Sequence, residues 1–176
     1  MDPGPNVKRF PGNCSARPLP PQVERCSKGM PSFKSGNYIF VSKRNVNKEY
    51  LDENHFVPCY MKDGKVYYCG EEKPSVDTPI QLRLYEALPN IRYMIHSHCH
   101  IANSDTPYTK RAIPCGAIEE VDEILKTIDE MYHTRNARTY KINLIGHGSI
   151  LMSDSIEGLE NITYYKRPMP ERIYTL

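Results

Sequence analysis

An Asp63-Gly64 pair lies between two short runs of β-branched and aromatic residues, 55–60 and 65–69. Both residues tolerate positive φ angles, so this pair favours a tight hairpin turn. The pattern predicts two antiparallel strands joined through residues 61–64. A purely parallel sheet is therefore excluded.

The rest of the chain alternates between strand and helix patterns. Apolar residues recur with helical spacing in two segments, one of which has Pro79 in its first turn. The predicted helices span 77–88 and 118–132, and further strands are predicted at 38–41, 92–95 and 141–145. We expect an α/β fold with three α/β/α layers and a central mixed, largely antiparallel sheet.

The first 31 residues differ from the rest of the chain. They contain seven of the fifteen prolines, and proline disrupts both helices and inner strands. We expect residues 1–31 to form an irregular arm and residues 32–176 to form the remainder of a single domain. One short helix is expected within 155–165.

Composition and charge exclude several classes of protein. The net charge is only +2 with both signs interspersed, so no concentrated basic patch points to nucleic acid. No segment approaches the ~20 apolar residues of a membrane-spanning helix. The N-terminus has no signal-peptide pattern, so we expect a cytoplasmic protein whose six cysteines, none in a CxxC pair, are reduced.

Three of the six histidines fall within residues 96–100, where a predicted strand ends. Side chains at i and i+2 of a strand share a face, so His96 with His98, or His98 with His100, can bind one metal ion. An isolated HxH pair is more often part of an ordinary loop. His147, between Gly146 and Gly148 after another strand, supplies a candidate third ligand.

Acidic residues that could act as acid or base precede the first predicted helix. They are Glu71, Glu72 and Asp77. Asp77 and Ser75 also occupy positions where either could simply cap the helix N-terminus, and the sequence alone favours capping.

Four segments in this order resemble the class II aldolase/adducin superfamily. They are Gly12-Asn13-Cys14-Ser15-Ala16-Arg17, Lys73-Pro74-Ser75-Val76-Asp77, Tyr93-Met94-Ile95-His96-Ser97-His98 and Ile145-Gly146-His147-Gly148. The superfamily includes L-fuculose-phosphate aldolases, ribulose-phosphate 4-epimerases and methylthioribulose-phosphate dehydratases. The resemblance extends from residue 12 to about residue 160.

The resemblance implies one divalent metal ion per chain, usually zinc, held by His96, His98 and His147. In the family's aldolases this ion polarises the substrate carbonyl and stabilises an enediolate. Asp77 stands where the family has a glutamate acid/base, and its shorter side chain is a departure from the pattern. The family's phosphate pocket corresponds to Gly12, Asn13, Ser42, Lys43 and Ser75.

The resulting hypothesis is a metal-dependent lyase that cleaves a small hydroxylated, phosphorylated keto-sugar by a retro-aldol reaction. The resemblance also implies a homotetramer in which a neighbouring subunit supplies a tyrosine. A dehydratase or epimerase is the alternative reaction, and Asn47-Lys48-Glu49 and Thr78-Pro79 are similar to dehydratase segments. An adducin-like scaffold without catalysis is the alternative from another class.

Overall fold

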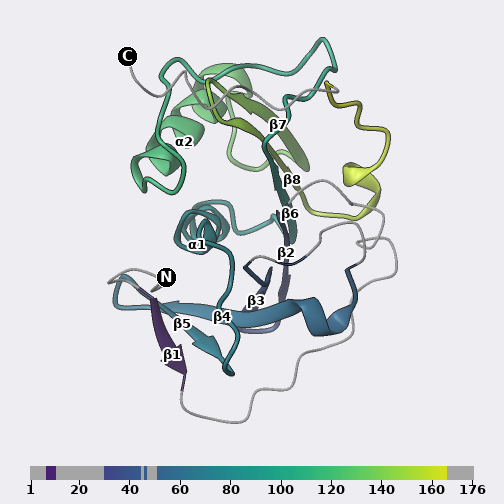
Figure 1. Cartoon of the computed structure of the whole chain (residues 1–176). Coiled ribbons are helices and arrows are strands. Elements are labelled where there is room, and N and C mark those ends of the chain that lie inside the picture. Colours follow the sequence, from purple (N-terminus) through teal and green to yellow (C-terminus); the bar gives the residue numbers. More distant parts are fainter. Residues whose placement is uncertain (1–6, 11–29, 45, 47–50, 166–176) are drawn as a thin grey trace.

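The described part of the chain forms one sheet of eight strands, in the order β1-β5-β4-β3-β2-β6-β8-β7. The computed structural model describes residues 7–10, 30–44, 46 and 51–165 (Figure 1). The strands are β1 (Val7–Phe10), β2 (Met30–Ser35), β3 (Tyr38–Ser42), β4 (Phe56–Lys62), β5 (Lys65–Cys69), β6 (Tyr93–Ser97), β7 (Thr139–Leu144) and β8 (Gly148–Ser153).

The strand pairing is antiparallel except at one edge. β1 runs parallel to β5, whereas the other neighbouring strands, from β5 to β7, pair antiparallel. The predicted hairpin is β4–β5, and Asp63 and Gly64 have φ angles of 51° and 71°. The prediction of a mixed, largely antiparallel sheet is therefore confirmed.

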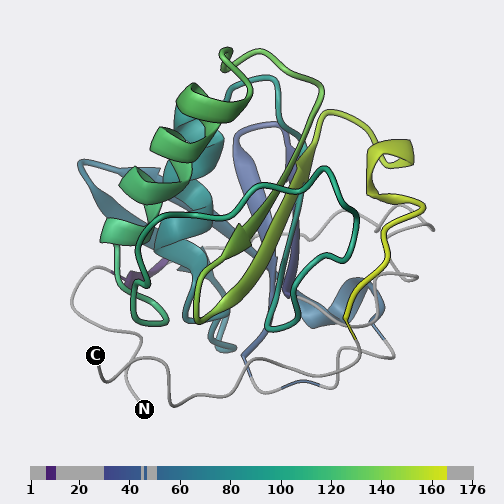
Figure 2. The same cartoon turned by 90° about the horizontal axis from the view of Figure 1, so that it is seen from above.

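Two α-helices pack on one face of the sheet, α1 (Thr78–Ala87) and α2 (Glu119–Met131). Their buried side chains join those of alternate strand residues in one large apolar core. Leu84, Met94, Ile124 and Ile142 are completely buried there. Figure 2 shows both helices on the same side of the strands.

The opposite face is covered by connecting segments and short 3-10 helices. Phe33, Phe40, Leu51 and Phe56 form one cluster there, and Ile95, Ile101 and Leu151 form another. The 3-10 helices are η2 (Glu53–His55) and η3 (Glu157–Leu159). Within the described residues both α-helices lie on one face, so the expected helical layer on the other face is not seen.

Several segments differ from the sequence-based expectation. Residues 7–10 of the expected irregular arm form β1, and β2 begins at Met30. The expected helix within 155–165 is only the three-residue η3, whose middle residue, Gly158, has a low helix propensity. The division of the chain at residue 31 stays a prediction.

The cysteines do not share one state. Cys69 is disulfide-bonded, so the prediction of reduced thiols is wrong at this residue. Cys59, Cys99 and Cys115 carry free thiols.

The helices in the described part of the chain include no candidate membrane span, since each of them is too short or too polar.

Candidate metal centre

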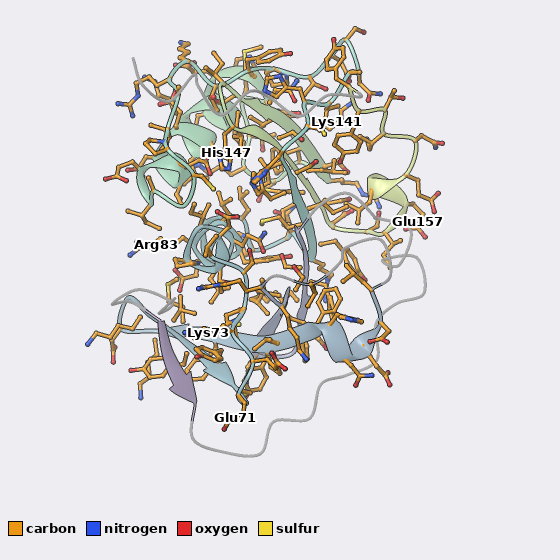
Figure 3. The ribbon with its side chains drawn as sticks, viewed as in Figure 1. Glu71, Lys73, Arg83, Lys141, His147 and Glu157 are labelled. Carbon is orange, nitrogen blue, oxygen red and sulfur yellow. The ribbon has the colours of Figure 1, made fainter. Side chains whose placement is uncertain are left out.

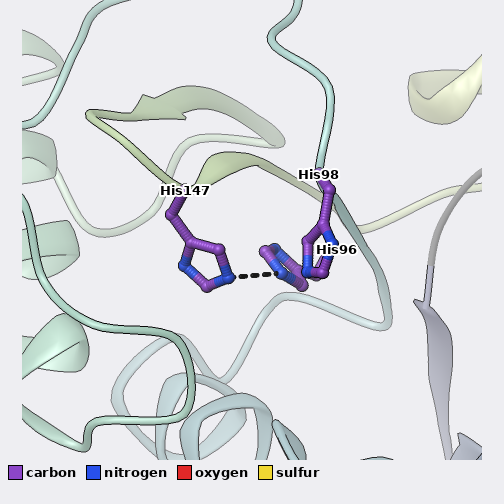
Figure 4. A group of neighbouring side chains, drawn as sticks. All are labelled: His96, His98 and His147. Atoms are coloured by element: carbon purple, nitrogen blue, oxygen red, sulfur yellow. Dashed lines mark hydrogen bonds between the residues drawn. The ribbon is translucent and has the colours of Figure 1, made fainter. Parts of the chain in front are cut away.

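Three of the sequence-predicted residues, His96, His98 and His147, lie together at one end of the sheet (Figure 4). Their potential ligand atoms all lie within 4.8 Å of one another. His96 lies in β6, and His98 follows that strand directly. His147 lies in the turn between β7 and β8, between α2 and the sheet (Figure 3).

The strand pattern explains why His96 faces the helices. Met94 in β6 belongs to the apolar core under α1 and α2. Strand side chains alternate, so His96 points to the same side as Met94. His96 and His147 are buried, whereas His98 is exposed. The cluster therefore opens to solvent at His98.

Gly148 allows the β7–β8 turn to lie directly against the end of β6. A Cβ atom at this position would lie 2.0 Å from the Ser97 carbonyl oxygen and 2.7 Å from the Cα of His98. Any side chain would force the two strand ends apart. His147, the preceding residue, is thereby held close to His96.

The Nδ1 atoms of the two buried histidines are both hydrogen-bonded. Nδ1 of His96 lies 3.0 Å from the Ser149 carbonyl oxygen, which can only accept, so this nitrogen donates. Nδ1 of His147 lies 2.6 Å from Oε1 of Glu120. The Nε2 atoms of His96 and His147 face each other at 3.1 Å. With both Nδ1 atoms donating, the two Nε2 lone pairs converge when the rings are neutral.

Burial and neighbouring groups shift the pKa values of these two rings in opposite directions. Burial and the neighbouring His147 and His98 lower the pKa of His96 well below its usual value. Burial also lowers the pKa of His147, but hydrogen bonds with Cys115 and Glu120 outweigh it and raise this pKa to about 10.

Asp77 places a buried carboxylate beside this pair. Its Oδ2 lies 3.9 Å from Nε2 of His96, and neither carboxylate oxygen has a hydrogen-bond partner among the described residues. Burial raises the pKa of Asp77, although His147 opposes the shift. Asp77 occupies the N-cap position of α1 without a side-chain capping bond, so capping does not account for this carboxylate.

The structure also brings together three residues of the predicted phosphate pocket. The Ser75 amide donates to the Ser42 carbonyl at 2.9 Å, and Lys43 forms a β-bridge with Pro74. The Ser42 hydroxyl is buried and has no hydrogen-bond partner within the described segments. The segment that carries Ser75 leads directly to Asp77. Gly12 and Asn13 lie outside the described residues.

His100, the other candidate in the histidine run, does not join the cluster. Its Nε2 donates a 3.1 Å hydrogen bond to the Leu144 carbonyl, and its ring meets the Tyr108 ring edge to face. Of the two possible i, i+2 pairs, the structure thus brings His96 and His98 to His147. His100 instead fixes the end of β7.

Sequence reasoning missed Glu120 and Cys115. Glu120 is buried in the first turn of α2 with Ile124 and Thr127 on the same helix face, a spacing that could have identified it. Cys115 has an exposed side chain, and hydrogen bonds with His147 and His98 lower the pKa of its thiol.

The other acidic candidates from the sequence are Glu71 and Glu72. Both are exposed in the link between β5 and α1.

Comparisons with known proteins agree with this arrangement. Residues 7–156 match the model of the Class II Aldolase and Adducin N-terminal domain. Among solved structures, the fold is similar to that of YgbL, a candidate aldolase, epimerase or decarboxylase, from Escherichia coli and from Klebsiella pneumoniae.

The likeness to these structures is one of fold. The Escherichia coli protein superposes with a TM-score of 0.53 at 14% identity, covering 75% of this chain and 70% of that one. The Klebsiella pneumoniae protein superposes with a TM-score of 0.51 at 13% identity, covering 77% of this chain and 72% of that one. The family match covers most of the sequence, including all three clustered histidines. The chain therefore belongs to the class II aldolase and adducin N-terminal domain family.

Proposed function

We propose that this protein is a metal-dependent lyase that cleaves a small, phosphorylated keto-sugar by a retro-aldol reaction. The observation that carries the proposal is the convergence of the three histidines, with the two buried Nε2 atoms only 3.1 Å apart. A divalent ion bound between these two nitrogens would accept both lone pairs in this buried site. The exposed side of the cluster leaves room for a substrate.

The donor set fits a divalent ion bound by His96, His98 and His147. Three imidazoles suit zinc, and three protein ligands are typical of catalytic sites, in which another position stays open. When bound, the ion supplies Lewis-acid polarisation of a substrate carbonyl. The protein's own groups must then orient the substrate and move its protons.

Asp77 is the proposed acid/base. Its carboxylate is buried, lies beside His96 and has both oxygens available. A raised pKa brings a carboxyl group closer to the pH at which proton transfer in both directions is efficient. Asp77 would hold the proton that leaves or enters the substrate carbon next to the carbonyl.

The residues before α1 and at the end of β3 are the proposed phosphate pocket. Ser42 and Ser75 offer hydroxyl groups, and Lys43 adds a positive charge that suits a phosphate. The predicted Gly12 and Asn13 complete this set. A homotetramer, as the family resemblance implies, is part of the same proposal.

The first experiment is metal analysis of tag-free protein by inductively coupled plasma mass spectrometry, before and after chelation. We expect about one zinc ion or similar divalent ion per chain, and loss of that ion in the His98→Ala and His147→Ala variants. The control is His133→Asn, because His133 is exposed, has a φ angle of 57° that asparagine tolerates, and lies beyond α2. Equal metal content in all variants would contradict the proposed ligands.

The second experiment separates the metal ligands from the acid/base. Asp77→Asn should retain the metal ion and lose about 10²- to 10⁴-fold in kcat on ketose phosphates. Product analysis identifies the reaction, since retro-aldol cleavage yields two carbonyl fragments whereas dehydration or epimerisation yields one product. Metal binding without turnover of any ketose phosphate would favour the non-catalytic scaffold.

A further inference from the structure

A buried carboxylate at the start of α2 contacts His147 of the histidine cluster. Glu120 is only 4% exposed, although glutamate seldom occupies such a position without a partner. Its Oε1 lies 2.6 Å from Nδ1 of His147, a charge-assisted distance. The contact joins residues 27 positions apart, so it ties α2 to the β7–β8 turn.

The direction of this hydrogen bond determines what His147 offers to the cluster. A carboxylate accepts, so Nδ1 of His147 donates and the proton of the neutral ring stays on Nδ1. The lone pair is then on Nε2, the atom that faces His96. Without the acceptor, the ring could turn or hold its proton on Nε2, and it would then direct no lone pair toward His96.

The two buried histidines are held by different kinds of acceptor. His96 donates from Nδ1 to the neutral carbonyl of Ser149, which no side-chain substitution removes. His147 donates to a charged side chain, which also increases the electron density that the ring offers from Nε2. His147 is therefore the proposed ligand whose ring is held by another side chain.

We propose that Glu120 is a positioning residue that holds the His147 ring in the orientation in which Nε2 faces the metal site. This inference rests on the proposed function, because it takes His147 as a ligand. Glu120 acts through His147 and has no direct role in the reaction. The competing explanation is that Glu120 only anchors α2 to the turn and stabilises the fold.

The test compares Glu120→Ala and Glu120→Gln with Glu119→Gln. Glu119 is the exposed neighbour in the same helical turn, so its substitution makes the same change in charge away from His147. Zinc affinity is measured by competition with a chromophoric chelator. We expect Glu120→Ala to bind zinc about 10- to 100-fold more weakly, Glu120→Gln to lie between it and the wild type, and Glu119→Gln to match the wild type.

A second measurement reports on the ring itself. In zinc-loaded protein with ¹⁵N-labelled histidine, the Nδ1 proton of His147 should give a slowly exchanging, downfield NMR signal that disappears in Glu120→Ala. A stabilising role alone would lower the melting temperature and leave zinc affinity and this signal unchanged in Glu120→Gln.

Three outcomes relate the inference to the proposed function. If wild-type protein binds zinc and both Glu120 variants bind it equally tightly, the inference is overturned and the proposed function stands. If wild-type protein binds no divalent ion at all, both are overturned. If the Glu120 variants bind zinc more weakly but the wild-type protein has no lyase activity, the positioning role of Glu120 is supported and the proposed lyase function is contradicted.

Discussion

Gly148 shows how a residue without a side chain sets the geometry of the histidine cluster. The closest atoms to a Cβ at this position belong to the backbone of Ser97 and His98, and backbone cannot turn aside as a long side chain can. The φ angle of Gly148 is +154°, which residues with a side chain rarely adopt. Conformation and space therefore both require glycine.

We expect Gly148→Ala to lower the free energy of unfolding by roughly 2 to 4 kcal/mol and to weaken zinc binding, because the turn with His147 must move away from β6. Gly64→Ala is the matched control, since Gly64 also has a positive φ but a Cβ added there would meet no atom within 4 Å. Gly64→Ala should lower the free energy of unfolding by about 1 kcal/mol. Urea unfolding and chelator competition provide the two measurements, and unchanged zinc affinity in Gly148→Ala would contradict this account.

At the residue scale, the sequence predicted the histidines better than their partners. His96 and His98 follow from strand alternation, and His147 from its place between two glycines after a strand. The contact between His147 and Glu120 depends on how α2 docks against the β7–β8 turn. Such docking is set by the whole core, and no local pattern reports it.

At the scale of elements, α2 also holds the loop that leads to Cys115. The Glu123 carboxylate accepts from the backbone amides of Lys110 and Arg111 at 3.0 and 3.1 Å, and from Nε of Arg111 at 3.0 Å. Glu123 is buried, whereas Glu130 on the same helix meets Nζ of Lys110 in an exposed ion pair at 2.7 Å. The two contacts join the same helix and loop in different environments.

Glu123→Ala should therefore destabilise the protein by about 2 to 3 kcal/mol, because it leaves two backbone amides without their charged acceptor. Glu130→Ala should change stability by less than about 0.5 kcal/mol, since exposed ion pairs contribute little. Limited trypsin digestion tests the loop directly, and cleavage after Lys110 or Arg111 should accelerate only in Glu123→Ala. Equal digestion of both variants would show that the buried contact does not hold the loop.

The sequence predicted helices and strands correctly where the apolar residues are periodic, and it missed strands where they are not. The apolar periods predicted α1 and α2 to within one residue at each end, and the Asp-Gly turn predicted β4–β5. β8 was missed because all six of its residues are buried, so it lacks the alternation of a half-exposed strand. β2 contains Pro31, which the sequence alone associates with an irregular segment.

At the scale of the whole molecule, the candidate site forms where distant segments meet on one face of the sheet. Asp77 precedes α1, Glu120 begins α2, His96 lies in β6 and His147 lies in the β7–β8 turn. Both α-helices lie on this face and direct their N-terminal ends toward the cluster. The sequence predicted the mixed sheet from local signals, but which face the helices cover depends on the long-range pairing.

Because the proposed ligands come from the end of β6 and from the β7–β8 turn, zinc should bind the folded chain far more tightly than the unfolded chain. Zinc at 100 times its dissociation constant should then stabilise metal-free protein by about 2.7 kcal/mol. For a chain of this length, that free energy raises the melting temperature by roughly 5 to 10 °C. Scanning calorimetry of chelator-treated protein, with and without zinc, measures the shift. His147→Ala should lose it and His133→Asn should keep it, whereas an equal shift in His147→Ala would mean that zinc binds elsewhere on the chain.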